Sequence, residues 1–214
     1  AVETKVSAIL LAAGRSQRMG APKPLLPVRG RPAVVRCLEC LRDSQVADIV
    51  LVVNPEGGAI AEAAGEFRVR VAVNELPGSD MAGSVKAGLS LVDRDATGVL
   101  VCLCDHPLVS PETIAAMASA HSRMPGAIVI PAWRGRKGHP TLFPRPLLEG
   151  LGTLSTLRDV IGRHDSEISI LDVDDEGVVL DMDTPEDYQR ILDRQARSHL
   201  RRPAGQAAPG KSEG

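Results

Sequence analysis

Aromatic side chains are scarce in this chain. Its 214 residues include two Phe, one Trp and one Tyr, together 2% of the sequence, while apolar residues make up 43%. The core must therefore be built from Leu, Val, Ile and Ala, in an amount that is ordinary for a soluble globular protein. A chain of this length can form one large α/β domain or two small domains.

A strong net charge is also missing. Lys and Arg number 25 against 27 Asp and Glu, which gives a formal net charge of −2. So small a charge creates no overall field that would hold nucleic acid or an anionic membrane surface. We therefore expect no nucleic-acid partner, and any anion-binding site must be local.

Long apolar runs are absent as well. The longest run near the start lies in AVETKVSAILLAAG and is too short to cross a bilayer. The same stretch lacks the basic region and cleavage site of a signal peptide. We therefore expect a cytoplasmic protein that has no membrane partner.

Cysteines are too few for a disulfide framework. Cys37 and Cys40 fall in a helical pattern at a spacing also found in redox and zinc motifs, but no second such pair accompanies them. Cys102 and Cys104 alternate on an apolar strand, so their side chains should share one face. Four buried or half-buried free thiols are the favoured interpretation, and a metal site on these cysteines is the alternative.

Short apolar runs alternate with helical patterns along the chain. Strands are predicted at residues 6–12, 48–53, 69–73, 98–104, 127–131, 168–173 and 178–180. Helices are predicted at 33–42, 81–92, 147–151 and 155–163, after Ser110 and from residue 185. This order predicts right-handed βαβ units, and hence a three-layer α/β/α Rossmann-like fold with a mostly parallel sheet. The Arg-, Gly- and Pro-rich segment 133–146 breaks the alternation and is interpreted as an insertion or lid.

The loop after the first strand is the most informative segment, because ligands of such sheets bind outside the carboxyl ends of the strands. It reads LAAGRSQRMGAPK and contains three cations, Arg15, Arg18 and Lys23. Gly14 and Gly20 allow backbone N–H groups to approach an anion. Arg can bind phosphate through two nitrogens, and Lys acts as a point charge. These are the parts of a triphosphate-binding loop; a solvated basic turn is the alternative.

Two common phosphate loops are missing from this segment. A Walker loop requires a different spacing from that between Gly14 and Gly20, and no Lys follows Gly20. The dinucleotide fingerprint GxGxxG fails because Ser16 occupies the place of its second glycine. An NAD(P)-binding domain is therefore disfavoured.

The whole pattern LAAGxSxRMGxxKxLL resembles the signature of the MobA-like nucleotidyltransferase family, and its Ala-Ala-Gly form resembles the MocA-type branch, the molybdenum cofactor cytidylyltransferases. The resemblance implies a fold of the nucleotide-diphospho-sugar transferase type. It also implies that Arg18 and Lys23 are catalytic. The nucleotide contacts that it implies in this loop are Leu11, Ala12, Ala13, Gly14, Arg15 and Lys23.

Two acids follow predicted strands. Asp105 comes after the most apolar strand, and Mg²⁺ commonly binds through one or two carboxylates together with substrate phosphates. Asp183 lies in DMDTPED, where a helix cap with acids in its first turn is the alternative. The family resemblance implies that Asp105 and Asp183 bind Mg²⁺ and that Asp105 is catalytic. His106 stands where the family more often has Gln or Met.

Two other segments resemble those of the family. The segment NELPGSDMAGS corresponds to one that contacts base and ribose, which implies contacts from Asn74, Ser79 and Ser84; an ordinary capped helix is the alternative. GHPTLF corresponds to a segment over the acceptor, where His139 would contact a phosphate or pterin and the preceding cations would balance charge. A solvated surface hairpin is the alternative there. His121, in contrast, is expected on the surface.

The resemblance implies transfer of an NMP, CMP from CTP, onto the terminal phosphate of molybdopterin with release of pyrophosphate. No general base is needed, because a phosphate monoester has a second pKa of about 6. A molybdenum enzyme or its insertion chaperone is the implied protein partner. The alternatives are another nucleotide such as GTP, another phosphorylated acceptor, or a non-catalytic nucleotide-binding maturation factor. We expect one domain over residues 1–197, with a nucleotide-binding part at about 5–110, an acceptor-binding part at about 111–197 and a disordered tail at 198–214.

Overall fold

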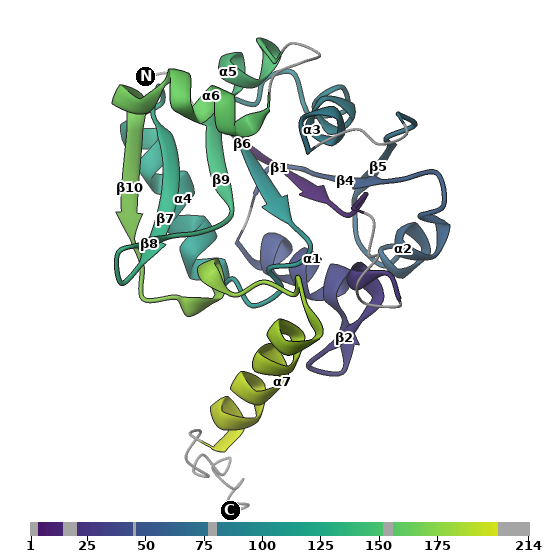
Figure 1. Cartoon of the computed structure of the whole chain (residues 1–214). Helices are drawn as coiled ribbons and strands as arrows, with labels where there is room; N and C mark the ends of the chain where they lie inside the picture. Colours follow the sequence, from purple (N-terminus) through teal and green to yellow (C-terminus); the bar gives the residue numbers. More distant parts are fainter. Residues whose placement is uncertain (1–3, 15–20, 45, 77–80, 152–155, 201–214) are drawn as a thin grey trace, which may run out of the picture.

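The computed structural model describes residues 4–14, 21–44, 46–76, 81–151 and 156–200, with the backbone alone for residues 195–200. Within these residues, eight strands form one mixed sheet in the order β10-β7-β9-β6-β1-β4-β5, and β8 pairs with β7 (Figure 1). The strands are β1 (Val6–Leu11), β4 (Ile49–Val53), β5 (Arg70–Val73), β6 (Gly98–Leu103), β7 (Ile128–Trp133), β8 (Arg136–Lys137), β9 (Thr141–Pro144) and β10 (Ile168–Asp172). A separate hairpin pairs β2 (Pro27–Val28) with β3 (Arg31–Pro32).

Helices cover both faces of this sheet. They are α1 (Ala33–Asp43), α2 (Gly58–Ala63), α3 (Met81–Leu89), α4 (Pro111–Arg123), α5 (Arg145–Glu149), α6 (Leu157–Arg163) and α7 (Pro185–Leu200). Three short 3₁₀ helices, η1 (Lys23–Leu25), η2 (Asp165–Glu167) and η3 (Glu176–Val179), complete the described elements. In the described part of the chain, no helix has both the length and the apolar character needed to cross a membrane.

Alternation along the buried strands creates the two halves of the core. In β1, Ala8 and Leu10 face a cluster that includes α1, α2 and α4, while Ile9 faces another that includes α3, α5 and α6. A strand buried on both faces carries a continuous apolar run, which is the pattern that predicted it. The three-layer α/β/α fold with a mostly parallel sheet is confirmed.

The expectation of an insertion or lid at residues 133–146 is wrong. β9 lies inside the sheet, antiparallel to both β6 and β7, and all four of its residues are buried. The turn residues that suggested a lid close the tight β7–β8 hairpin, where Arg134 and Gly135 have φ of 48° and 78°. A hairpin turn of this kind requires positive φ at both central positions.

The strand expected at residues 178–180 is also absent; η3 occupies this part of the chain. Asp175 starts η3 by accepting a hydrogen bond from the Gly177 backbone N–H at 2.9 Å. Its other carboxylate oxygen accepts bonds from the Ser110 N–H at 2.8 Å and the Thr113 hydroxyl at 2.7 Å. The apolar run at residues 178–180 therefore follows a turn that the Asp175 carboxylate stabilises, and it does not pair with another strand.

The four cysteines are free thiols, as expected. Cys37, Cys102 and Cys104 are buried and Cys40 is half-buried. A side-chain hydrogen bond with Cys37, together with burial, raises the pKa of Cys104, and burial raises the pKa of Cys102 and Cys40. Among the described residues, no group of three or more His, Cys, Asp or Glu has an arrangement that could hold a metal ion.

The last helix is attached to the body through the β2–β3 hairpin. Met182 and Ile191 pack with Val28 in a small separate cluster, and the Tyr188 hydroxyl donates to the Pro27 carbonyl at 2.6 Å. In Figure 1, α7 accordingly lies beside β2, below the sheet. This attachment brings the segment before α7 to the edge where β1 and β6 end.

Candidate active site

The loop after β1 begins at the centre of the sheet's carboxyl edge. Ala12 is buried and Ala13 half-buried, whereas Gly14 is exposed, so the backbone passes from core to surface within three residues. The Cys104 N–H donates to the Leu11 carbonyl at 3.1 Å, which places Asp105 directly beside the start of this loop. The predicted site residues Arg15, Arg18 and Ser79 lie outside the described residues. For the residues that are described, positive φ occurs at Gly30 and Gly135 among the glycines, not at Gly14.

Lys23 and Asp183 meet at this edge although 160 positions separate them. The Lys23 ammonium lies 2.7 Å from a carboxylate oxygen of Asp183. Lys23 is set by η1, which follows the β1 loop, and Asp183 comes just before α7. The structure therefore places two of the predicted residues in direct contact.

Asp105 lies close to the same lysine. Burial by itself raises the pKa of Asp105, but a hydrogen bond from His106 and the positive charge of Lys23 contribute to lowering it, and the resulting pKa is below its usual value. The carboxylate is therefore ionised at neutral pH. The Lys23 ammonium thus pairs with the carboxylate of Asp183 and acts through its charge on that of Asp105.

His106 fixes the orientation of Asp105. Its Nδ1 lies 2.8 Å from Asp105 Oδ1, so the ring N–H donates to the ionised carboxylate. The side chain of His106 is only 9% exposed, and its ring centroid lies 4.9 Å from that of His139. No role for this histidine was predicted from the sequence. The signal available was its position next to a predicted metal ligand, and the hydrogen bond shows what that position does.

His139 lies beside this pair, and its role at the acceptor stays a prediction. Burial and the charge of His106 lower the pKa of His139 to about 4, so its ring is neutral at pH 7. Its backbone N–H donates to the Val178 carbonyl at 2.8 Å, and the His139–Pro140 peptide bond is cis. η3 therefore holds the segment that carries this ring.

The acids in and before the first turn of α7 were interpreted either as a helix cap or as metal ligands, and different residues of this segment fit each interpretation. The Thr184 hydroxyl accepts the Asp187 N–H at 3.1 Å and donates to the Asp187 carboxylate at 2.7 Å, which is the predicted cap. Asp181 accepts the backbone N–H of Asp183 at 3.0 Å. The cap therefore uses Thr184 and Asp187, while the side chain of Asp183 faces Lys23.

Asn74 and Ser84 have a structural partner in each other. The Asn74 amide donates to the Ser84 hydroxyl at 2.9 Å, and both residues are buried. The Asn74 side-chain oxygen also accepts the Leu76 N–H at 3.2 Å. These bonds hold the connection from β5 to α3. A contact with the base or ribose stays a prediction for both residues.

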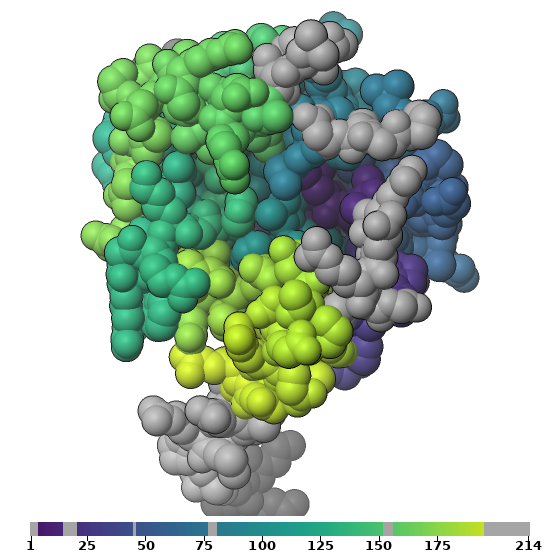
Figure 2. Space-filling view, viewed as in Figure 1, coloured from purple at the N-terminus to yellow at the C-terminus, as the bar shows by residue number. Residues whose placement is uncertain are grey.

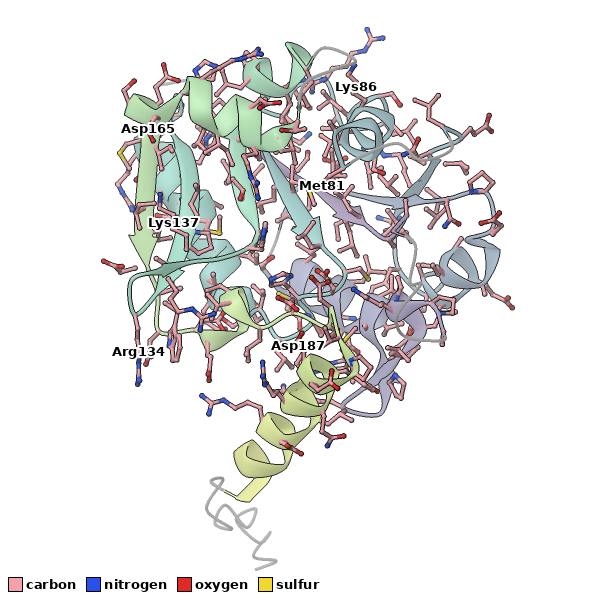
Figure 3. The ribbon with its side chains drawn as sticks, viewed as in Figure 1. Met81, Lys86, Arg134, Lys137, Asp165 and Asp187 are labelled. Atoms are coloured by element: carbon pink, nitrogen blue, oxygen red, sulfur yellow. The ribbon has the colours of Figure 1, made fainter. Side chains whose placement is uncertain are left out.

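A cleft of about 490 Å³ opens on the face of the sheet that carries α3 and α6. Figure 2 shows the molecule hollowed near the middle of this face. Its described lining residues come from α3, β6, β9, the segment before β9 and the start of α6: Met81, Ala82, Val101, Leu103, His139, Thr141, Phe143, Thr156, Leu157, Arg158 and Ile161. In Figure 3, Met81 lies near the centre, whereas Arg134 and Lys137 lie at the outer side by β8. The cations before His139 are therefore not part of this lining.

An α/β sheet with a Lys–Asp pair and a second acid at the carboxyl edge of its central strands fits the nucleotidyltransferase class. The chain belongs to the MobA-like NTP transferase domain family, which matches residues 8–168. The family membership predicted from the sequence is thus confirmed.

Solved structures and curated proteins place the chain among relatives with different names. The crystal structure of Rv0371c from Mycobacterium tuberculosis is 30% identical, with a TM-score of 0.78 over 89% of this chain and 98% of that chain. Its complex with manganese gives 28% identity and a TM-score of 0.74 over the same shares of the two chains. Nicotine blue oxidoreductase from Paenarthrobacter nicotinovorans is 29% identical over 87% of this chain and 96% of its own length. A 2-C-methyl-D-erythritol 4-phosphate cytidylyltransferase from Frankia casuarinae is 37% identical over 54% of this chain and 44% of its own length.

Proposed function

We propose that this chain transfers CMP from CTP onto the terminal phosphate of molybdopterin and releases pyrophosphate. The observation that carries the transfer reaction is the Lys23–Asp183 ion pair, whose ammonium also acts on the charge of Asp105 beside the loop that follows β1. The choice of CTP and molybdopterin rests on the resemblance of the Ala-Ala-Gly and Gly-His-Pro segments to the MocA-type branch.

A divalent cation, Mg²⁺, is part of the proposal, and Asp105 and Asp183 would hold it. The donors fit this ion, because both are carboxylates and Mg²⁺ is usually bound by one or two of them plus phosphate oxygens and water. The absence, within the described residues, of a larger ligand cluster agrees with that pattern. Manganese in the related Rv0371c structure supports a divalent cation. When bound, such a cation neutralises charge on the triphosphate.

Lys23 and Asp183 exchange partners when the nucleotide binds. In the free protein the Lys23 ammonium neutralises Asp183 at 2.7 Å. A triphosphate brings a greater negative charge to the ammonium, and Asp183, no longer paired with Lys23, would be able to hold the cation. Lys23 and the loop after β1 hold the phosphates, so that the α-phosphorus faces the incoming acceptor phosphate. The acceptor dianion attacks without a base, and pyrophosphate leaves with the bonding electrons.

A second function is favoured by one observation. The relative named nicotine blue oxidoreductase matches almost the whole chain, so an oxidoreductase is the competing proposal. The first loop argues against it, because the second glycine of a dinucleotide fingerprint is replaced by Ser16. The two proposals differ in what they predict for Lys23 and Asp105. Nucleotidyl transfer requires both side chains, whereas hydride transfer requires neither.

Pyrophosphate release tests the proposal. The protein is incubated with Mg²⁺ and CTP, GTP, ATP or UTP, with and without molybdopterin, and nicotinamide absorbance is followed in parallel with NADH and NADPH. Release that needs both CTP and molybdopterin, and that is lost in Lys23→Ala, is the expected result. Release with GTP alone would overturn the cytidylyl choice. No release with any nucleotide, together with oxidation of NADH or NADPH, would establish the oxidoreductase instead.

A further inference from the structure

We propose that the cleft between α3, β9 and α6 binds the body of the acceptor, and that Arg158 determines its specificity by holding an anionic group separate from the reacting phosphate. This inference rests on the proposed nucleotidyl transfer and adds a place and a charge for the acceptor. The described cleft has about 490 Å³, within the roughly 300–1,000 Å³ of small-molecule sites.

The walls of the cleft indicate the chemistry of the body. Leu103 on β6 and Phe143 on β9 form its floor, and Leu157 and Ile161 come from α6. Met81 closes the α3 side and is 43% exposed. Polar groups in the lining are few, and two of them are threonine hydroxyls. A ring system with apolar faces and polar edges suits such a cleft, whereas a polyol would leave many hydroxyl groups without partners.

The cleft is continuous with the reacting site through His139. This residue is in the lining of the cleft, and its ring packs 4.9 Å from that of His106, which binds Asp105. An acceptor in the cleft therefore directs one end toward Asp105 and Lys23. The reacting phosphate belongs at that end, because the two carboxylates and the lysine lie there.

Arg158 supplies the permanent charge of the cleft. Among its described lining residues, Arg158 is the one that is charged at every physiological pH, since the other titratable group, His139, is neutral at pH 7. Arg158 forms no ion pair within the part of the chain that the structure describes. The neighbouring Asp159 is held in a capping box, accepting the Thr156 N–H at 2.8 Å and its hydroxyl at 2.9 Å. The guanidinium is thus available to an anionic ligand.

The acceptor defined by this lining has an apolar ring system and two anionic groups. One is the phosphate that reacts near Asp105, and the other faces Arg158 at the α6 side of the cleft. In molybdopterin the second group is the dithiolene, with or without its metal. A small polyol phosphate such as 2-C-methyl-D-erythritol 4-phosphate has neither the ring nor the second anion.

The test compares Arg158→Gln with Arg163→Gln, a matched control on the same helix whose side chain does not line the cleft. We expect Arg158→Gln to raise the KM for molybdopterin about 10-fold or more. The KM for CTP and the melting temperature should not change, and Arg163→Gln should behave as the parent chain. Arg158→Lys should recover part of the loss, because it keeps the charge and loses the planar fork.

Binding of molybdopterin alone, followed by its pterin fluorescence, separates this inference from the transfer reaction. If Arg158→Gln binds molybdopterin more weakly but no variant shows turnover, the cleft is supported as the acceptor site and the proposed transfer reaction is overturned. Normal turnover with equal molybdopterin KM values in the two Gln variants would overturn the role of Arg158. Efficient use of 2-C-methyl-D-erythritol 4-phosphate by the parent chain would overturn the acceptor class.

Discussion

Charged residues cluster both where the strands of the sheet begin, its amino edge, and where they finish, its carboxyl edge. The two clusters differ in how their charges are paired. At the amino edge, Lys5 lies 3.0 Å from Asp93 and 2.9 Å from Asp95, while Arg70 lies 2.7 Å from Asp93 and also pairs with Asp48. These residues lie at or just before the starts of β1, β4, β5 and β6, so the charges hold the strand ends to one another.

The carboxyl edge has fewer cations for its acids in the described part of the chain. There Lys23 pairs with Asp183 and influences Asp105, whose other partner is a histidine. At the amino edge each cation is held between two acids at the strand ends, whereas at the carboxyl edge the proposed reaction requires the Lys23 ammonium to exchange Asp183 for a phosphate. We therefore expect the charged residues of the amino edge to contribute to stability and those of the carboxyl edge to contribute to ligand binding. The following experiments test this difference.

Replacing Asp105 at the carboxyl edge should have the largest effect. Asp105→Asn removes a carboxylate from the proposed cation site while keeping the size of the side chain. We expect pyrophosphate release to fall roughly 100- to 1000-fold, because charge stabilisation of the transferring group is lost. The melting temperature should stay the same or fall slightly, because the lowered pKa of Asp105 means that the fold favours its ionised form. An active Asp105→Asn enzyme would show that this edge is not the reacting site.

His106 should have the next largest effect, and a pair of variants isolates its hydrogen bond. His106→Leu removes the donor to Asp105 and should lower kcat or the affinity for Mn²⁺ about 10- to 100-fold. His106→Asn places an N–H near the position of Nδ1 and should restore most of the loss. Titration of Mn²⁺ by electron paramagnetic resonance reads the effect on the cation directly. Equal defects in the two variants would mean that His106 acts through packing alone.

At the amino edge, the expected effects are on stability and not on turnover. Arg70→Gln breaks contacts with Asp48 and Asp93, and should lower the melting temperature by roughly 1–3 °C. Arg123→Gln, which removes an exposed hydrogen bond to Ser119, is the control and should change neither property. A clear loss of kcat in Arg70→Gln would contradict the division between the two edges.

His121 gives the amino edge a modest pH dependence. It is fully buried, its Nε2 lies 3.1 Å from the Thr97 hydroxyl, and burial lowers its pKa. The unfolded chain therefore binds a proton more readily, and the free energy of unfolding should fall as pH drops below about 6.5. In urea titrations at several pH values, His121→Asn should flatten this slope. An unchanged slope in His121→Asn would assign the effect to other groups.

The sequence predicted the core better than it predicted individual polar residues. Runs such as 98–104 are apolar throughout and can only be buried strands, so the order of layers follows from them. β9 was missed because its neighbours are turn residues, and pairing between distant strands leaves no local signal. His121 was expected on the surface, but Gly98 leaves room for its ring, since a Cβ there would lie 2.7 Å from the imidazole.

The site residues show the same limit. Lys23, Asp105 and Asp183 were selected from motifs, but no pattern in the sequence states that the lysine and the second acid touch. The contact depends on how α7 packs on the β2–β3 hairpin, which is a tertiary property. Asn74 and Ser84 were selected by resemblance, and their mutual hydrogen bond became visible only in the fold.

The separation of 160 positions between Lys23 and Asp183 also sets an order of events during synthesis. A chain emerging from the ribosome can pair β1, β4, β5 and β6 while the last helix is still unmade, because domains form as their segments become available. The loop after β1 is then present without its distant acid. The Lys23–Asp183 pair can form only after residue 183 has been made, so a chain interrupted before it would carry a nearly finished sheet without this pair.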